Sequence, residues 1–151
     1  MIAWLKANSA EALASSNGPG SAGQLLGLKF ANATGVTFSF VPYRGGESAS
    51  MQDLLAGRLP VKFAQPADSL SLVRSGAIRA YAVTAKTRLA AAPELPTTDE
   101  AGLPDFHVSV WHGLWLPKGT PAPIVTKLNA AVTTTLADQT VRERLAELAP
   151  R

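Results

Sequence analysis

The sequence contains no cysteine among its 151 residues. Disulfides, thiolate metal sites and cysteine nucleophiles are therefore excluded, although a chain without cysteine can work in any compartment. The two histidines, His107 and His112, have no set of carboxylates beside them, because only Asp105 is close in sequence. A zinc site needs several such ligands at suitable spacing. We therefore expect no metal site, and nothing in the sequence calls for a cofactor.

Long apolar runs and clusters of one charge are also missing. No stretch approaches the roughly 20 apolar residues that a transmembrane helix requires. The first residues do not combine a basic start, an apolar run and a small-residue cleavage site, so we predict no signal peptide in this chain. The formal net charge is +3, but Lys and Arg are scattered singly. This pattern disfavours nucleic-acid binding and suits a small organic anion at least as well.

A folded α/β domain is predicted from what is present. Hydrophobic residues make up 46% of the chain and charged residues 17%, which is ordinary for a folded protein. Strand-like and helix-like segments alternate from the start. The predicted strands are Leu13–Ser16, Thr37–Val41, Val61–Phe63 and Ile78–Thr84, and the predicted helices are Ile2–Ala7, Ala22–Ala33, Ser48–Ala56 and Ala67–Ser75. This alternation favours a mostly parallel sheet flanked by helices.

The remainder of the chain is less regular at first and then helical. Residues 86–104 are rich in Ala, Pro and Thr and are predicted to be a loop with a short helix at Thr98–Ala101. Short strand-like runs are then expected at Val108–Trp111 and Leu114–Leu116, followed by a helix at Pro123–Leu136. A final helix is expected at Gln139–Leu148, with Asp138 as its N-cap.

Glycine-rich turns follow the first two predicted strands and lead into helices. They span Asn17–Ser21 and Tyr43–Gly46. Helix N-termini carry unpaired N–H donors and partial positive charge, which favour a carboxylate or phosphate. In a parallel sheet the segments Ser15–Ser21, Tyr43–Glu47 and Gln65–Asp68 lie beyond the carboxyl ends of the strands, along one edge. The sequence therefore predicts an anion site at this edge.

These turns also allow a simpler interpretation. Taken alone, a turn such as Gly18–Gly23 more often only starts a helix. It lacks the Gly-Lys-Ser/Thr of a nucleotide-binding loop. The serines Ser15, Ser16 and Ser21 lack a Gly-x-Ser-x-Gly elbow and a placed His/Asp pair, so we predict no enzyme and no catalytic residue.

Several segments, in this order, resemble the substrate-binding receptors of tripartite tricarboxylate transporters, the Bug family. The matching segments are Gly18–Gly23, Val41–Gly46, Asp53–Gly57, Ser75–Ala80, Ala101–Pro104, Trp111–Trp115 and Pro121–Ala130. Each motif is weak alone, but the ordered series covers nearly the whole chain. The resemblance implies a periplasmic receptor with two α/β lobes that close on a small carboxylate and work with membrane transporter subunits.

The resemblance also implies which residues contact the ligand. Family members hold a carboxylate on backbone N–H groups and hydroxyls of loops. Carried over to this sequence, the ligand-binding residues are Ser15, Ser16, Gly20, Ser21, Ala22, Tyr43, Gly45, Gly46 and Gln65. At Ala64 relatives commonly carry Asp, and its loss removes an acceptor for an ammonium group, which disfavours amine-bearing ligands.

A second departure from the family concerns length, because the family chain is about twice as long. Its first strand and first glycine-rich loop would precede Met1. The resemblance therefore implies a periplasmic-binding-protein-like lobe at 1–110 that carries the carboxylate-binding loops. Residues 111–151 would be a crossing segment and helices that pack on the other lobe, leaving an incomplete second lobe. The alternative is a truncated lobe that acts as an interaction module without ligand capture, with a homodimer formed through the exposed helix 123–136.

Overall fold

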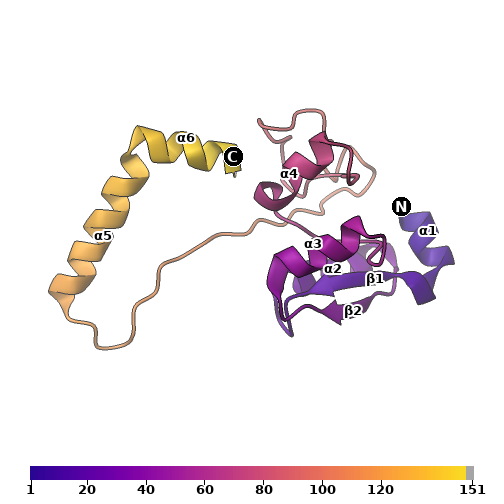
Figure 1. The fold of residues 1–151 in the computed structure, drawn as a ribbon, viewed down its shortest axis with the longest axis horizontal. Helices are drawn as coiled ribbons and strands as arrows, with labels where there is room; N and C mark the ends of the chain where they lie inside the picture. Colours follow the sequence, from indigo (N-terminus) through magenta and orange to yellow (C-terminus); the bar gives the residue numbers. More distant parts are fainter. Residues whose placement is uncertain (149–151) are drawn as a thin grey trace.

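The computed structural model describes residues 1–148 and has mixed α/β architecture (Figure 1). In chain order the elements are α1 (Ile2–Ala7), the short 3-10 helix η1 (Ser9–Glu11), β1 (Leu13–Ser16), α2 (Ala22–Thr34), β2 (Ser39–Pro42), α3 (Gly46–Leu55), α4 (Pro66–Arg74), α5 (Ala122–Ala137) and α6 (Gln139–Leu148). The predicted fold class is confirmed, and the predicted helices that begin the chain and that surround the first two strands are present.

The sheet is small and parallel. Strands β1 and β2 pair in register from Leu13 opposite Ser39 to Ser16 opposite Pro42. Beyond them, Val61 contributes one parallel bridge, to Ala14. Because β1 and β2 run in the same direction, the turns that follow them lie at the same edge of the sheet, as predicted.

Four strand predictions are wrong, and so is the short helix predicted at Thr98–Ala101. The segment Val61–Phe63 is reduced to a single bridge, and in Ile78–Thr84 only Val83 forms one, with Thr97. The runs Val108–Trp111 and Leu114–Leu116 form no strand. A strand exists only where a neighbour accepts its hydrogen bonds, and these apolar segments have at most an isolated partner. Residues 98–101 form only a turn closed by the Ala101 N–H and the Thr97 carbonyl, at 3.0 Å.

Two apolar clusters hold the lobe together. The first surrounds Phe30 of α2, whose ring centroid lies 5.6 Å from that of Phe63 and 5.8 Å from that of Phe106. The second packs Leu70 of α4 against Leu89, Ala92 and Leu95, and so fixes the Ala/Pro/Thr-rich loop on the helix. Glycines in the left-handed conformation follow two helices: Gly35 follows α2 with φ of +71°, and Gly76 follows α4 with φ of +75°.

Residues 111–148, called the arm below, are arranged differently. Figure 1 shows α5 standing apart from the lobe at the end of an extended segment, with α6 turning back toward α4. Every residue from 121 to 140 is exposed, and α5 buries none of its side chains. The predicted Asp138 cap is confirmed, because its Oδ1 accepts a 3.1 Å hydrogen bond from the Val141 N–H. Within residues 1–148 no helix combines the length and apolar character needed to cross a bilayer.

Candidate functional site

The two glycine-rich turns meet at the carboxyl edge of the sheet. The Tyr43 N–H donates to the Ser16 carbonyl at 2.8 Å, which continues the β1–β2 pairing into the turns. Across the turns, Asn17 Nδ2 donates to Glu47 Oε1 at 2.6 Å. The structure thus brings together the two loops that the sequence predicted to share an edge.

Internal hydrogen bonds shape the turn before α2. The Gly20 N–H donates to Gln24 Oε1 at 2.8 Å, and Ser21 Oγ accepts a 3.2 Å hydrogen bond from the Asn17 N–H. Ser21 occupies the N-cap position of α2, but its hydroxyl does not bond to the amides of this helix. The hydroxyl instead closes the turn on Asn17. The amides of Ala22 and Gly23 lie in the first turn of the helix, where N–H groups have no i−4 carbonyl within the helix.

A cavity of about 380 Å³ lies beside this first turn. Its lining is mostly apolar and comes from α2, residues 63–65 and residues 108–111, with Glu47 of α3. The lining residues are Ala22, Gly23, Leu25, Leu26, Lys29, Glu47, Phe63, Ala64, Gln65, Val108, Ser109, Val110 and Trp111. The volume falls in the range of small-molecule sites.

Among the predicted ligand-binding residues, only Ala22 and Gln65 line this cavity. Ser15 and Ser16 are buried. The Tyr43 hydroxyl donates to Asp53 Oδ2 at 2.7 Å. The others, Gly20, Ser21, Gly45 and Gly46, belong to the turns without lining the cavity. The turns therefore supply the framework, while the cavity surface comes from residues that sequence reasoning mostly missed.

An ion pair with a buried lysine joins the segment after α3 to the start of this helix, and the sequence interpretation overlooked it. Lys62 Nζ, on a side chain only 1% exposed, donates to Glu47 Oε2 and to Ser50 Oγ. Burial acts to raise the pKa of Glu47, but hydrogen bonds from Lys62 and Asn17 and the Lys62 charge together bring this pKa below its ordinary value. Glu47 is therefore ionised at neutral pH. Two features of the sequence could have indicated this ion pair. One is a lysine inside the apolar run Val61–Phe63, and the other is an acidic residue directly after Gly45-Gly46.

One cation lines the cavity among the described residues. Lys29 Nζ donates to the His107 carbonyl at 2.8 Å and lies 5.2 Å from the centroid of the Phe106 ring. His107 itself contacts Asp99, with Nε2 2.8 Å from Oδ2. Within residues 1–148 no group of three His, Cys, Asp or Glu side chains is placed to hold a metal ion.

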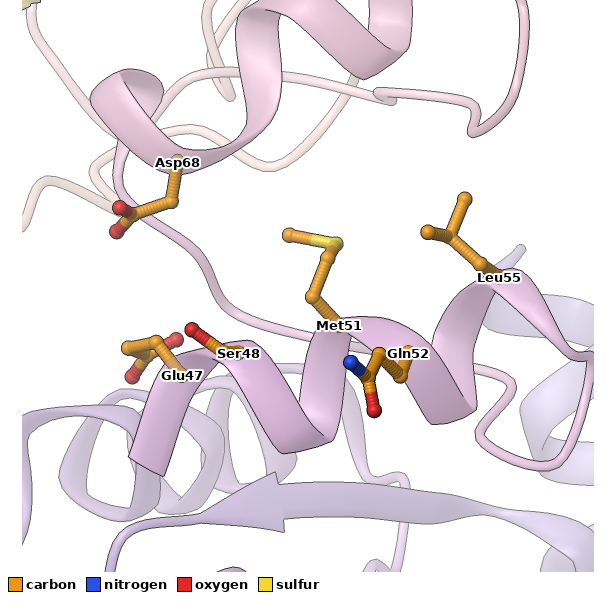
Figure 2. Close-up of a pocket in the computed structure, with 6 residues that line it drawn as sticks. All are labelled: Glu47, Ser48, Met51, Gln52, Leu55 and Asp68. Carbon is orange, nitrogen blue, oxygen red and sulfur yellow. The ribbon is translucent and has the colours of Figure 1, made fainter. Parts of the chain in front are cut away.

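A second, smaller pocket of about 270 Å³ lies between α3 and α4. Figure 2 shows Asp68 on α4 facing the end of α3 that carries Glu47 and Ser48, with Met51 and Leu55 farther along α3. It shares only Glu47 with the larger cavity and contains no predicted ligand-binding residue.

Comparisons with known proteins place these features in a family. A family model described as "Tripartite tricarboxylate transporter family receptor" matches residues 1–149. A UPF0065 protein of Agrobacterium vitis is 40% identical over 98% of this chain, which covers 42% of that protein. Protein BugT of Bordetella pertussis is 34% identical over 97% of this chain and 44% of its own length. The chain thus spans less than half the length of these curated relatives.

Solved structures agree with the sequence comparison. MatC from Rhodopseudomonas palustris with bound malate superposes with a TM-score of 0.89 at 33% identity, over 98% of this chain and 50% of that one. An R. palustris protein with adipate gives a TM-score of 0.90 at 32% identity, over 99% and 50%. The periplasmic binding protein BugD gives 0.86 at 34% identity, over 97% and 49%. The lobe and the arm together therefore have the arrangement of half of such a receptor.

Proposed function

The chain belongs to the tripartite tricarboxylate transporter receptor family, which consists of solute-binding receptors rather than enzymes, and from this premise we propose that it binds a small organic carboxylate in the periplasm for delivery to membrane transporter subunits. The observation that supports this most directly is the cavity of about 380 Å³ lined by Ala22 and Gly23 of the first turn of α2. Donors at a helix N-terminus stabilise a carboxylate without any reactive side chain. The malate and adipate in two related structures belong to the same chemical class.

The affinity of this chain alone is expected to be low. It spans about half the length of the solved relatives, and residues of the other half would add contacts to the ligand. Hydrogen bonds to charged groups contribute about 1.5–3 kcal/mol each, and each factor of ten in affinity corresponds to about 1.4 kcal/mol. Two or three such bonds separate micromolar from millimolar binding, so we expect dissociation constants near the millimolar range.

Replacing Ser21 with Ala is expected to weaken carboxylate binding by about fivefold, roughly the worth of one hydrogen bond. The hydroxyl of Ser21 fixes the turn through the Asn17 N–H, so its loss frees the amides at the start of α2. Amide chemical shifts of Ala22 and Gly23 during titration with malate or benzoate measure this loss. Asp53→Asn is the control, because Asp53 bonds to Tyr43 and Arg58 outside the cavity. Equal losses in both variants would show that the site lies elsewhere.

The exposed face of α5 favours a second proposal, association of two copies. The large apolar side chains Ile124, Val125, Leu128, Val132 and Leu136 are between 37% and 53% exposed. Within Ala122–Ala137 the only charged residue is Lys127, so two such faces meet with little repulsion. A contiguous apolar surface of this kind is typical of an association site. A second copy of α5, or an exchanged arm, provides a matching surface.

The dimer is tested by light scattering over a wide range of protein concentration. We expect the mass to rise toward twice the chain mass, and we expect Leu128→Asp to prevent this rise because it places a charge in the contact. With 3.6 residues per turn, Thr134 lies on the face of α5 opposite the apolar side chains. Thr134→Asp therefore introduces the same charge away from the contact and should leave association unchanged. A strict monomer at the highest concentration, or equal effects of the two variants, would contradict a dimer through this face.

A further inference from the structure

We infer that the half-site on this chain selects acids with one carboxylate and an apolar body over dicarboxylates and amino acids. This inference rests on the proposed function and names the substrate class of the same cavity. The inference covers only the cavity residues of this chain. A second carboxylate on the ligand would have to be held by groups that this chain does not supply. Malate and adipate, found in related structures, are dicarboxylates, so the inference separates this chain from those relatives.

The cavity wall is suited to a hydrocarbon body. Leu25, Leu26, Phe63, Val110 and Trp111 all line it. Trp111 is 73% exposed and Leu25 is 57% exposed, so large apolar surfaces at the cavity remain in water when no ligand is bound. An aliphatic or aromatic body placed against them removes this surface from water, which is favourable in proportion to the apolar area covered. A second carboxylate in the same place would lose its own hydration without a matching gain.

The charges at the cavity balance only one ligand charge. Lys29 supplies one positive charge, with its Nζ already donating to the His107 carbonyl. Glu47 supplies one negative charge, and the buried Lys62 that pairs with Glu47 does not line the cavity. One ligand carboxylate is accommodated by the donors of Ala22 and Gly23. Because Lys62 compensates the charge of Glu47, a second ligand carboxylate would find no further cation among the described residues that line the cavity, and its charge would stay unbalanced.

An ammonium group is disfavoured by the same arrangement. Glu47 is the only acidic residue that lines the cavity within the described chain. Its Oε1 accepts from Asn17 and its Oε2 from Lys62, so its charge is already compensated. Ala64, which also lines the cavity, offers no side-chain acceptor. The neutral polar groups that remain in the wall, Gln65 and Ser109, suit the hydroxyl or carbonyl oxygen of an otherwise apolar acid.

Hexanoate and adipate form a matched pair of probes, because both are unbranched six-carbon acids and differ only in one end group. Amide chemical-shift titrations of the 151-residue chain should give a dissociation constant about tenfold lower for hexanoate than for adipate, as expected for one uncompensated end group. Shifts should appear at Ala22 and Gly23 with both ligands and at the Trp111 indole mainly with hexanoate. Equal or tighter binding of adipate would overturn this inference and leave the proposed function intact. Absence of shifts with both acids would overturn the proposed function as well.

A pair of leucines on α2 tests the location. Leu25 lines the cavity, whereas Leu28, which is 50% exposed on the same helix, does not. We expect Leu25→Ala to weaken hexanoate binding about fivefold while Leu28→Ala leaves it within about twofold. Trp111→Ala and Trp115→Ala form a second pair, because Trp115 is 77% exposed and lies outside the cavity wall. Equal losses within either pair would overturn the assignment of the apolar body to this cavity.

Discussion

Replacing Glu47 with Gln should lower the free energy of unfolding by about 3 kcal/mol, the lower end of the cost of removing one partner of a buried ion pair. The Lys62 side chain is only 1% exposed, and the variant leaves it without its carboxylate partner. The Ser50 hydroxyl still accepts from Nζ, which moderates the cost. Chemical denaturation of the variant and of the unchanged protein at neutral pH measures the difference.

The two partners of this ion pair are not equivalent. Glu47 is 43% exposed at its side chain, so water can hydrate its carboxylate once Lys62 is gone. Lys62→Met should therefore cost much less than Glu47→Gln, and the double variant should recover part of the stability lost in Glu47→Gln, because no unpaired charge stays buried. If Lys62→Met proves as costly as Glu47→Gln, the loss arises from packing rather than from an uncompensated charge.

The effect of Glu47→Gln should depend on pH. The folded pKa of Glu47 lies below its ordinary value of 4.5, so its ionised form adds stability above that value. This contribution is lost as the pH falls through the folded pKa, because the folded carboxylate must then take up a proton. The stability difference between the unchanged protein and Glu47→Gln should thus shrink in acid. A difference that stays constant down to about pH 3 would contradict an electrostatic origin.

Glu100 provides the matched control for these measurements. It forms an ion pair with Arg88 in which both side chains are close to half exposed. Exposed pairs contribute little because water screens them and their side chains lose freedom, so Glu100→Gln should change the free energy of unfolding far less than Glu47→Gln does. A loss in Glu100→Gln that equals the loss in Glu47→Gln would show that burial of Lys62 is not the deciding factor.

The helices were predictable from local signals, whereas several strands were not. The spacing of apolar residues and the end signals at Gly35, Gly76 and Asp138 fix helix ends within the chain segment itself. A strand depends on a neighbour that the segment does not specify. Ile78–Thr84 has the composition of a strand, but only Val83 finds a partner, at Thr97.

The candidate site shows the same division between local and distant signals. Turn chemistry and strand direction predicted that Asn17–Ser21 and Tyr43–Gly46 would meet, and they do. The ion pair between Glu47 and Lys62 joins residues 15 apart, and the hydrogen bond between Asn17 and Glu47 joins residues 30 apart. No sequence period links these positions. The cavity wall likewise includes Trp111, whose place depends on the path of the crossing segment.

Gly27→Ala should destabilise the protein by about 2 kcal/mol, although Ala favours a helix over Gly by about 1 kcal/mol. A Cβ at Gly27 would lie 2.7 Å from Phe40 Cε1, 2.9 Å from Phe40 Cζ and 3.3 Å from Phe63 Cε2. Phe40 belongs to β2 and Phe63 packs against the Phe30 cluster, so both rings have little room to move. The added methyl group therefore pushes α2 away from the sheet.

Gly23→Ala on the same helix is the comparison that isolates this contact. The nearest atom to a Cβ at Gly23 is the Ser15 carbonyl oxygen at 3.7 Å, which is an ordinary contact distance. Without a clash, the substitution should leave stability unchanged or raise it by up to about 1 kcal/mol through helix propensity. Thermal and denaturant unfolding should therefore show a loss of stability for Gly27→Ala and no loss for Gly23→Ala. A stabilised Gly27→Ala variant would mean that α2 can shift on the sheet without loss, and the amides of Ala22 and Gly23 would then not be held in a fixed position for a carboxylate.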